Sequence, residues 1–284
     1  MAAWSVNSFA NSGIGLIIAA DCYCSNVKFP IRIFFLLQAL ALGAVASNSV
    51  VNLSHYDLLR PDFVAMKSEG VVGVIHEATF PRLSRDWRYS EREQEAIRSG
   101  LLWGAYHFGD GTDPVRQADH FLSVVGAERV PIRADDPEQR RHGVLLVLDF
   151  EKNGHYPGGT MSTSQAVAFV ERIKARTGKY PGLYCSENRL RQMLYGPGAS
   201  ATHRAVLSNC WLWVANYGAE PRNTSPWPRW HLWQYTGDGK CGLRPRGMFP
   251  IGVANMRRAE RNIFNGNNVA LEAFWQEHAW FPGG

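Results

Sequence analysis

The chain has 284 residues, of which 45% are hydrophobic and 19% are charged, and its formal net charge is +5 at pH 7. This composition is ordinary for a soluble globular protein that is long enough to bury one large core. The longest basic clusters are two arginine pairs, Arg140 with Arg141 and Arg257 with Arg258, so we expect no nucleic-acid partner.

The first recognisable segment, residues 28–46, has the order of a secretory signal peptide. Lys28 and Arg32 form a basic start, and an apolar stretch follows at 33–45. The small residues at 44–46 are typical of a cleavage site. We therefore expect a secreted or periplasmic protein with no integral membrane span after signal removal. The stretch is short for a membrane span, although an uncleaved anchor is the alternative.

Apolar runs that resemble strands begin at residue 50 and alternate with helical patterns. Strands are predicted at 50–56, 71–77, 101–108, 144–151, 180–186, 210–217 and 231–236. Near-continuous apolar runs such as VLLVL are typical of strands buried on both faces, which favours a parallel sheet.

The helical patterns between these runs have recognisable ends. A helix is predicted at 90–98, and a second at 115–125 after Asp113 and Pro114. A third follows the capping-box spacing of Ser162 with Gln165 and ends before Gly178.

This order of elements indicates one barrel-like α/β domain, in which five β-α units are followed by strands with little helix between them. We divide the chain into an N-terminal extension with the signal peptide (1–46), a catalytic barrel (48–266) and a short C-terminal helical tail (267–284).

Polar residues interrupt the strand candidates near their carboxyl ends, where parallel α/β barrels carry their functional face. They come from six strands: Asn52, Ser54, His55, Glu77, Thr79, Tyr106, His107, Asp149, Glu151, Asn216, Tyr217, Gln234 and Tyr235. Because these strand ends meet at one barrel mouth, we expect a single site there.

Asp149 and Glu151 are two residues apart, so on a strand their side chains point the same way and Phe150 points the opposite way. Glycoside hydrolysis needs a protonated carboxyl group and a second group that stabilises charge at the anomeric carbon. Glu151 has the longer side chain and is expected to be the proton donor, whereas Asp149 is expected to stay ionised. From these residues alone, metal ligation or a salt-bridged pair remains an alternative.

A series of motifs resembles the glycoside hydrolase family 25 lysozymes. The motifs are LSHY (53–56), VIHEAT (74–79), GAYHF (104–108), LVLDFE (146–151), PGLY (181–184), LWVANY (212–217), LWQYTG (232–237) and ERNIFNG (260–266). The resemblance implies an irregular TIM-like (β/α)5(β)3 barrel. It also implies hydrolysis, without metal or cofactor, of the β-1,4 bond between N-acetylmuramic acid and N-acetylglucosamine in peptidoglycan.

The resemblance assigns roles to the acidic pair: Glu151 is the acid, and Asp149 orients the substrate acetamido group, whose oxygen acts as internal nucleophile. Three positions depart from the family pattern. Asn52 and Glu260 each replace an Asp, and Glu77 is an acid where a base is usual. Loss of a charge at position 52 is expected to reduce the rate, because charge stabilisation in a dry site is worth on the order of 3 kcal/mol.

The predicted substrate-binding residues are Asn52, Tyr56, Glu77, Tyr106, Trp213, Tyr217, Gln234, Tyr235 and Glu260. The aromatic members could stack on sugar faces, with core packing as the alternative reading. The expected partner is the glycan strand of peptidoglycan, bound by a monomer.

Two other functions stay open at this point. Asn52 is compatible with a barrel that binds wall fragments without turnover. His55, His76 and His107 could instead serve a metal-dependent deacetylase or amidase, but no H-x-H or H-E-x-x-H element accompanies them, and Cys185, Cys210 and Cys241 show no zinc spacing. We therefore expect no metal.

Overall fold

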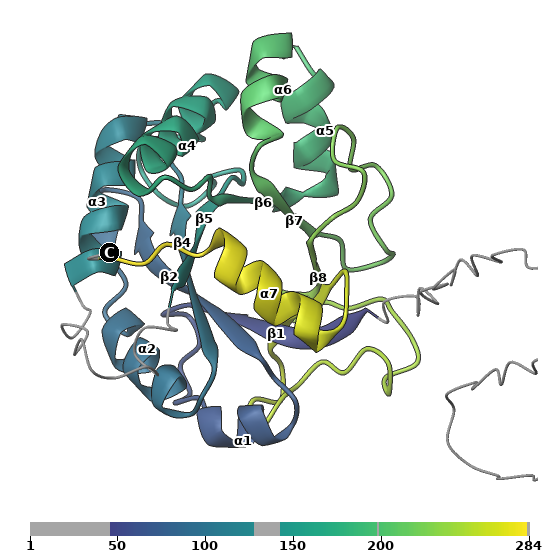
Figure 1. Ribbon diagram of the computed structural model, residues 1–284. Coiled ribbons are helices and arrows are strands. Elements are labelled where there is room, and N and C mark those ends of the chain that lie inside the picture. Colours follow the sequence, from purple (N-terminus) through teal and green to yellow (C-terminus); the bar gives the residue numbers. More distant parts are fainter. Residues whose placement is uncertain (1–45, 128–142, 198, 283–284) are drawn as a thin grey trace, which may run out of the picture. The chain divides into compact units, whose positions relative to one another are not determined.

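The computed structural model describes residues 46–127, 143–197 and 199–282 (Figure 1). The predicted signal peptide lies outside these residues except for Ala46. None of the helices in the described part is long and apolar enough to cross a bilayer. The three cysteines in that part, Cys185, Cys210 and Cys241, are free thiols.

The core of the fold is a closed, mixed barrel. Its strands are β1 (Ser47–Leu53), β2 (Gly73–Phe80), β4 (Leu102–Phe108), β5 (Val144–Asp149), β6 (Gly182–Ser186), β7 (Trp211–Ala215), β8 (Leu232–Thr236) and β9 (Glu260–Phe264). Parallel pairing runs from β1 through β8, and antiparallel β9 joins β8 back to β1. The short β3 (Ser84–Arg85) pairs with the end of β2. The predicted (β/α)5(β)3 barrel is confirmed.

Helices surround the strands in Figure 1. They are α1 (Phe63–Ser68), α2 (Tyr89–Arg98), α3 (Pro114–Ala127), α4 (Thr163–Thr177), α5 (Glu187–Tyr195), α6 (Ala201–Leu207) and α7 (Asn268–His278). The helices predicted at 90–98, 115–125 and 166–177 are confirmed as α2, α3 and α4. The capping box is also present, because Ser162 Oγ accepts from Gln165 N–H while Gln165 Oε1 accepts from Ser162 N–H.

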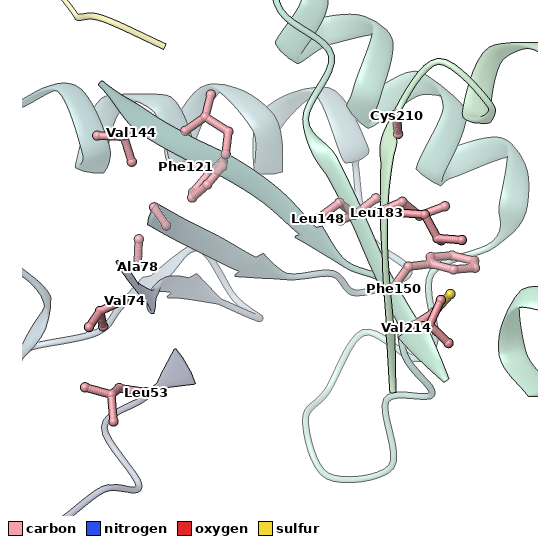
Figure 2. Close-up of a cluster of buried hydrophobic side chains, with 14 of the residues drawn as sticks. Leu53, Val74, Ala78, Phe121, Val144, Leu148, Phe150, Leu183, Cys210 and Val214 are labelled. Atoms are coloured by element: carbon pink, nitrogen blue, oxygen red, sulfur yellow. The ribbon is translucent and has the colours of Figure 1, made fainter. Parts of the chain in front are cut away.

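Alternation along each strand creates two hydrophobic cores. Leu145 and Val147 point into the barrel, where they pack with Ile75 and Trp213. Leu148 and its like-facing neighbours point outward against the helices, and Figure 2 shows part of this outer core. The barrel interior is therefore filled with side chains below the level of the functional face.

Helix α7 covers the end of the barrel at which the parallel strands begin. The indole of Trp275 donates to the carbonyl of Trp103 at 2.9 Å and lies directly over Gly73, where an added Cβ would be 2.7 Å from the ring. Phe274 makes an edge-on contact with Trp211, with ring centroids 5.4 Å apart. With this end closed, the opposite end, at the carboxyl termini of the parallel strands, is the one available for ligands.

Candidate active site

A cavity of about 720 Å³ opens at the carboxyl ends of the parallel strands. Every strand of the closed barrel contributes at least one wall residue. These include Asn52, Glu77, Tyr106, Asp149, Tyr184, Trp213, Thr236 and Glu260, in the order β1, β2, β4, β5, β6, β7, β8 and β9. Because β9 is antiparallel, its first residue reaches the same end as the last residues of the others. The single mouth expected from the polar strand ends is therefore present.

Asp149 and Glu151 both line this cavity. Asp149 is the last residue of β5, and the amide of Phe150 continues the pairing to the Tyr184 carbonyl at 2.8 Å. Phe150 points outward beneath the guanidinium of Arg189, 4.2 Å from its ring centroid. The alternation inferred from the sequence thus holds through the end of the strand and brings the two carboxyl groups to one wall.

Burial favours the neutral form of both acids. Desolvation, with the negative charge of Glu151 nearby, raises the pKa of Asp149 well above its usual range. Desolvation also raises the pKa of Glu151, an effect that Asp238 increases and Arg189 opposes. Within the described structure Asp149 Oδ1 is buried without a hydrogen-bond partner, so an unpaired charge there is costly. Burial therefore opposes the ionised form of Asp149, the member of the pair that the sequence predicted to stay ionised.

Asn52 and Glu260 form one hydrogen-bonded pair. The amide of Asn52 donates to Glu260 Oε2, and Gln234 Nε2 donates to the same oxygen at 3.0 Å. The Asn52 carbonyl oxygen in turn accepts from Asn262 Nδ2 at 2.9 Å. Desolvation is the main cause that raises the pKa of Glu260 to about 7, and the charges of Asp57 and Asp238 contribute.

Gln234 supports the wall rather than lining it. Its Oε1 accepts hydrogen bonds from the hydroxyls of Tyr184 and Tyr217, the latter at 3.3 Å, while its amide nitrogen reaches Glu260. Gln234 itself is 1% exposed. The sequence predicted it as a substrate-binding residue, and the structure places it behind residues that do face the cavity.

Tyr235 is not at the cavity, in contrast to the sequence prediction. Its side chain belongs to the outer core, where the hydroxyl donates to the Pro250 carbonyl at 2.6 Å and accepts from Asn48 Nδ2 at 2.8 Å. The reason is the two-residue period of a strand: because Gln234 points inward, its neighbour must point outward.

The remaining predicted binding residues, Tyr56, Glu77, Tyr106, Trp213 and Tyr217, all line the cavity. Trp213 is held by a hydrogen bond from its indole nitrogen to Asn262 Oδ1 at 2.8 Å. Its ring centroid lies 4.5 Å from that of Tyr184, so these two aromatic side chains form a continuous section of the wall.

Several wall residues were not predicted, among them Asp57, Tyr156, Tyr184, Asp238 and Arg258. Tyr184 is the last residue of the motif PGLY, so the polar-end pattern could have identified it. Tyr156 and Asp238 lie in loops whose conformation depends on tertiary contacts. Tyr156, for example, hydrogen-bonds to the Tyr56 hydroxyl at 2.5 Å across the cavity rim.

His76 and His107 do not join His55 in a common ligand set near Asp149. His107 is buried between Thr79 Oγ1 and Gln117 Oε1, at 2.8 and 2.9 Å, and burial lowers its pKa to about 4. His76 donates from Nδ1 to the Glu77 carbonyl, and burial lowers its pKa to about 3. In the described residues, the side chains that could share one ion are instead His55, Glu77 and Asp86.

Comparisons with known proteins agree with this architecture. The model of the glycosyl hydrolases family 25 matches residues 51–242. The chain is 28% identical over 234 residues to lysozyme M1 of Streptomyces globisporus, covering 78% of this chain and 69% of that protein. A lysozyme structure from Streptomyces coelicolor superposes with a TM-score of 0.62 at 27% identity, covering 82% of this chain and 99% of that one. The muramidase of Trichobolus zukalii has the same fold, with a TM-score of 0.60 at 22% identity and coverages of 81% and 100%.

Proposed function

Because the chain belongs to glycosyl hydrolase family 25 and is a glycoside hydrolase of the lysozyme type, we propose that it cleaves the β-1,4 bond between N-acetylmuramic acid and N-acetylglucosamine in peptidoglycan. The observation that carries this proposal is the placement of Asp149 and Glu151 together in the wall of an open cavity at the functional end of the barrel.

Glu151 is the general acid of the proposed reaction. It lies two residues beyond the deeper Asp149, is partly exposed to the cavity, and has a raised pKa that helps it to hold a proton near neutral pH. As the glycosidic bond breaks, this proton passes to the departing sugar oxygen, and the Glu151 carboxylate is left in the cavity.

Asp149 orients the acetamido group of the bound sugar. Its unpaired Oδ1 is suited to accept a hydrogen bond from the acetamido N–H, and such a bond stabilises the ionised form of Asp149. Substrate binding therefore favours transfer of the pair's proton from Asp149 to Glu151. The mechanism couples correct binding to formation of the active acid.

The acetamido oxygen then attacks the anomeric carbon and forms a cyclic intermediate while the leaving sugar departs. A water molecule, losing its proton to the Glu151 carboxylate, opens this ring at the same carbon. Two successive inversions retain the anomeric configuration, and no carboxylate across the sugar is needed as nucleophile.

Mass spectrometry and reducing-end analysis of sugars released from purified peptidoglycan test the proposal. We expect Glu151→Gln to lower the rate about 10²–10⁴-fold, because the amide cannot donate the proton that leaves with the sugar oxygen. Glu171→Gln, at an exposed position of α4, is the matched control and should retain native activity. Unchanged activity in Glu151→Gln would contradict the assignment, and release of acetate or peptide in place of reducing ends would favour a deacetylase or amidase.

The proposed site of action is outside the cytoplasm, where the wall polymer lies, with the enzyme acting as a monomer. The sequence of residues 28–46 supports export, and the net charge of +5 suits attraction to an anionic wall. We place the catalytic unit at residues 48–266.

A further inference from the structure

Three side chains with metal-ligand chemistry meet beside the cavity. His55 Nδ1 lies 2.6 Å from Glu77 Oε2 and 3.5 Å from Asp86 Oδ2, and the three ligand atoms are all within 4.8 Å of one another. They come from separate segments: His55 follows β1, Glu77 belongs to β2, and Asp86 precedes α2. The amide of Asp86 donates to the Ala78 carbonyl at 2.9 Å, which ties its segment to β2.

Asp86 is fully buried, yet only one of its carboxylate oxygens has a hydrogen bond. Oδ1 accepts from the backbone amide of Arg88 at 2.8 Å, whereas Oδ2, the atom that faces His55, has no hydrogen-bond partner within the described structure. Glu77 is also buried, with its side chain 5% exposed. His55 Nδ1 makes its hydrogen bond with Glu77, which leaves Asp86 Oδ2 without a hydrogen-bond donor.

Two of the nearby basic side chains, His76 and Arg92, donate their hydrogen bonds to other groups. His76 Nδ1, 3.8 Å from Asp86 Oδ2, donates to the Glu77 carbonyl at 2.7 Å. The Arg92 guanidinium donates to the carbonyls of Ser54 and Leu59 at 2.9 and 3.1 Å, and to His76 Nε2 at 3.0 Å. Two desolvated carboxylates with one donor between them are unfavourable unless a cation or a proton joins them.

We infer that His55, Glu77 and Asp86 bind a divalent transition-metal ion, for which an imidazole and two carboxylates are suitable ligands and Zn²⁺ is the best match. Ligand atoms of a tetrahedral zinc ion are about 3.3 Å apart, given bonds of about 2.0–2.1 Å. The 3.5 Å separation of His55 Nδ1 and Asp86 Oδ2 fits this value. The 2.6 Å hydrogen bond from His55 to Glu77 must lengthen as the metal replaces its proton.

The surroundings leave one coordination position open. Glu77 lines the cavity and His55 is 17% exposed, whereas Asp86 closes the buried side. Rings pack against the imidazole and hold its orientation, with Tyr56 at 4.1 Å and Phe80 at 4.9 Å between centroids. A water molecule or a sugar oxygen in the cavity would supply the remaining ligand. This site does not depend on the proposed hydrolytic reaction, because none of its ligands is part of the Asp149–Glu151 pair.

Isothermal titration of the chelator-treated full chain with ZnCl₂ tests the inference, and it reports binding whether or not the enzyme turns over substrate. We expect one ion per wild-type chain and at least about tenfold weaker binding in Asp86→Asn and in Glu77→Gln. Asp238→Asn, which removes a different cavity carboxylate, is the matched control and should bind zinc as the wild type does. Saturating zinc should also raise the unfolding temperature of the wild type and the control by about 3 °C or more.

X-ray absorption of the zinc-loaded wild type provides a test that needs no variant to fold. The expected spectrum contains one imidazole, oxygen ligands at about 2.0–2.1 Å and no sulfur. Failure of the wild type to bind stoichiometric zinc, equal binding in Asp86→Asn, or a sulfur ligand would each overturn the site. Absence of binding would indicate a proton shared by Glu77 and Asp86.

Discussion

Asn52 and Glu260, which both depart from the Asp residues expected by resemblance, are direct partners in the structure. An amide facing a carboxylate gives a donor and an acceptor, whereas two acids in the same positions would repel each other in a desolvated wall. Asn52 and Glu260 are therefore compatible as a pair. Position 52 lacks a charge, but its partner at position 260 has an ionisable carboxyl group.

This pairing predicts the effect of restoring the acid. Asn52→Asp removes the donor to Glu260 and adds a negative charge beside it, so we expect a loss of about 2 kcal/mol in unfolding free energy at pH 8 and a smaller loss at pH 5. Urea denaturation at the two pH values measures the difference. The sequence alone predicted a rate loss from Asn52, but because Asn52 is paired with Glu260 we expect no gain in peptidoglycan hydrolysis from Asn52→Asp. A large gain would show that the site needs an ion at position 52.

Glu260 also makes stability depend on pH. Its pKa is raised by burial from 4.5 to about 7 in the folded chain, so its contribution to stability is fully present below pH 4.5 and is lost as the pH rises through about 7. The shift corresponds to about 3 kcal/mol between these limits. In Glu260→Gln we expect the fall in unfolding free energy from pH 4.5 to 8 to be smaller by about this amount. The exposed variant Glu171→Gln should keep the native slope, and an unchanged slope in Glu260→Gln would refute the linkage.

At the scale of the element, strand alternation separates wall residues from core residues. Polarity at a strand end identified both Gln234 and Tyr235, but only the inward-facing member of such a pair can serve the site. Applied to β5, the same rule correctly placed Asp149 and Glu151 in one wall with Phe150 outside. The prediction of a barrel site must therefore consider the strand face on which a side chain lies as well as its polarity.

A pair of tyrosine variants tests this assignment of faces. Tyr217→Phe removes a hydroxyl in the cavity wall that donates to Gln234, so we expect kcat/KM on peptidoglycan to fall about five- to tenfold. Tyr235→Phe should leave kcat/KM within about twofold but lower the unfolding free energy by about 1–2 kcal/mol, because its buried hydroxyl has two partners. A fall in kcat/KM in Tyr235→Phe but not in Tyr217→Phe would indicate that Tyr235, and not Tyr217, contacts the substrate.

Short elements were the part of the secondary structure that periodicity did not reveal. The helices α1, α5 and α6 have 6, 9 and 7 residues, too few turns to display a stable apolar period. Each begins at a residue whose side chain caps it: Asp62, Ser186 and Ser200. Strand β9 was recognised only as a family motif, because its five residues mix Glu, Arg and Asn with two apolar positions.

At the scale of the whole molecule, helix α7 contributes to stability because it closes one end of the barrel. Trp275 is 1% exposed and seals the inner core, so we expect Trp275→Ala to lower the unfolding free energy by about 3–5 kcal/mol. Val269→Ala on the same helix, where the native side chain is 75% exposed, should change it by less than about 0.5 kcal/mol. Urea unfolding measures both, and similar values for the two variants would mean that α7 does not contribute to the core.

The sequence by itself determined the class of this protein: apolar runs and their polar ends predicted the barrel and its functional face, and the order of motifs indicated the family. These features are local, since strand period, caps and motif spacing act over a few residues. Tertiary structure alone decided which side chains from distant parts of the sequence meet and how deeply each acid is buried. Asn52 contacts Glu260, and His55 joins Glu77 and Asp86, only after the barrel closes. The raised pKa values of Asp149 and Glu151 likewise follow from desolvation, which depends on the packed surroundings of each carboxyl group.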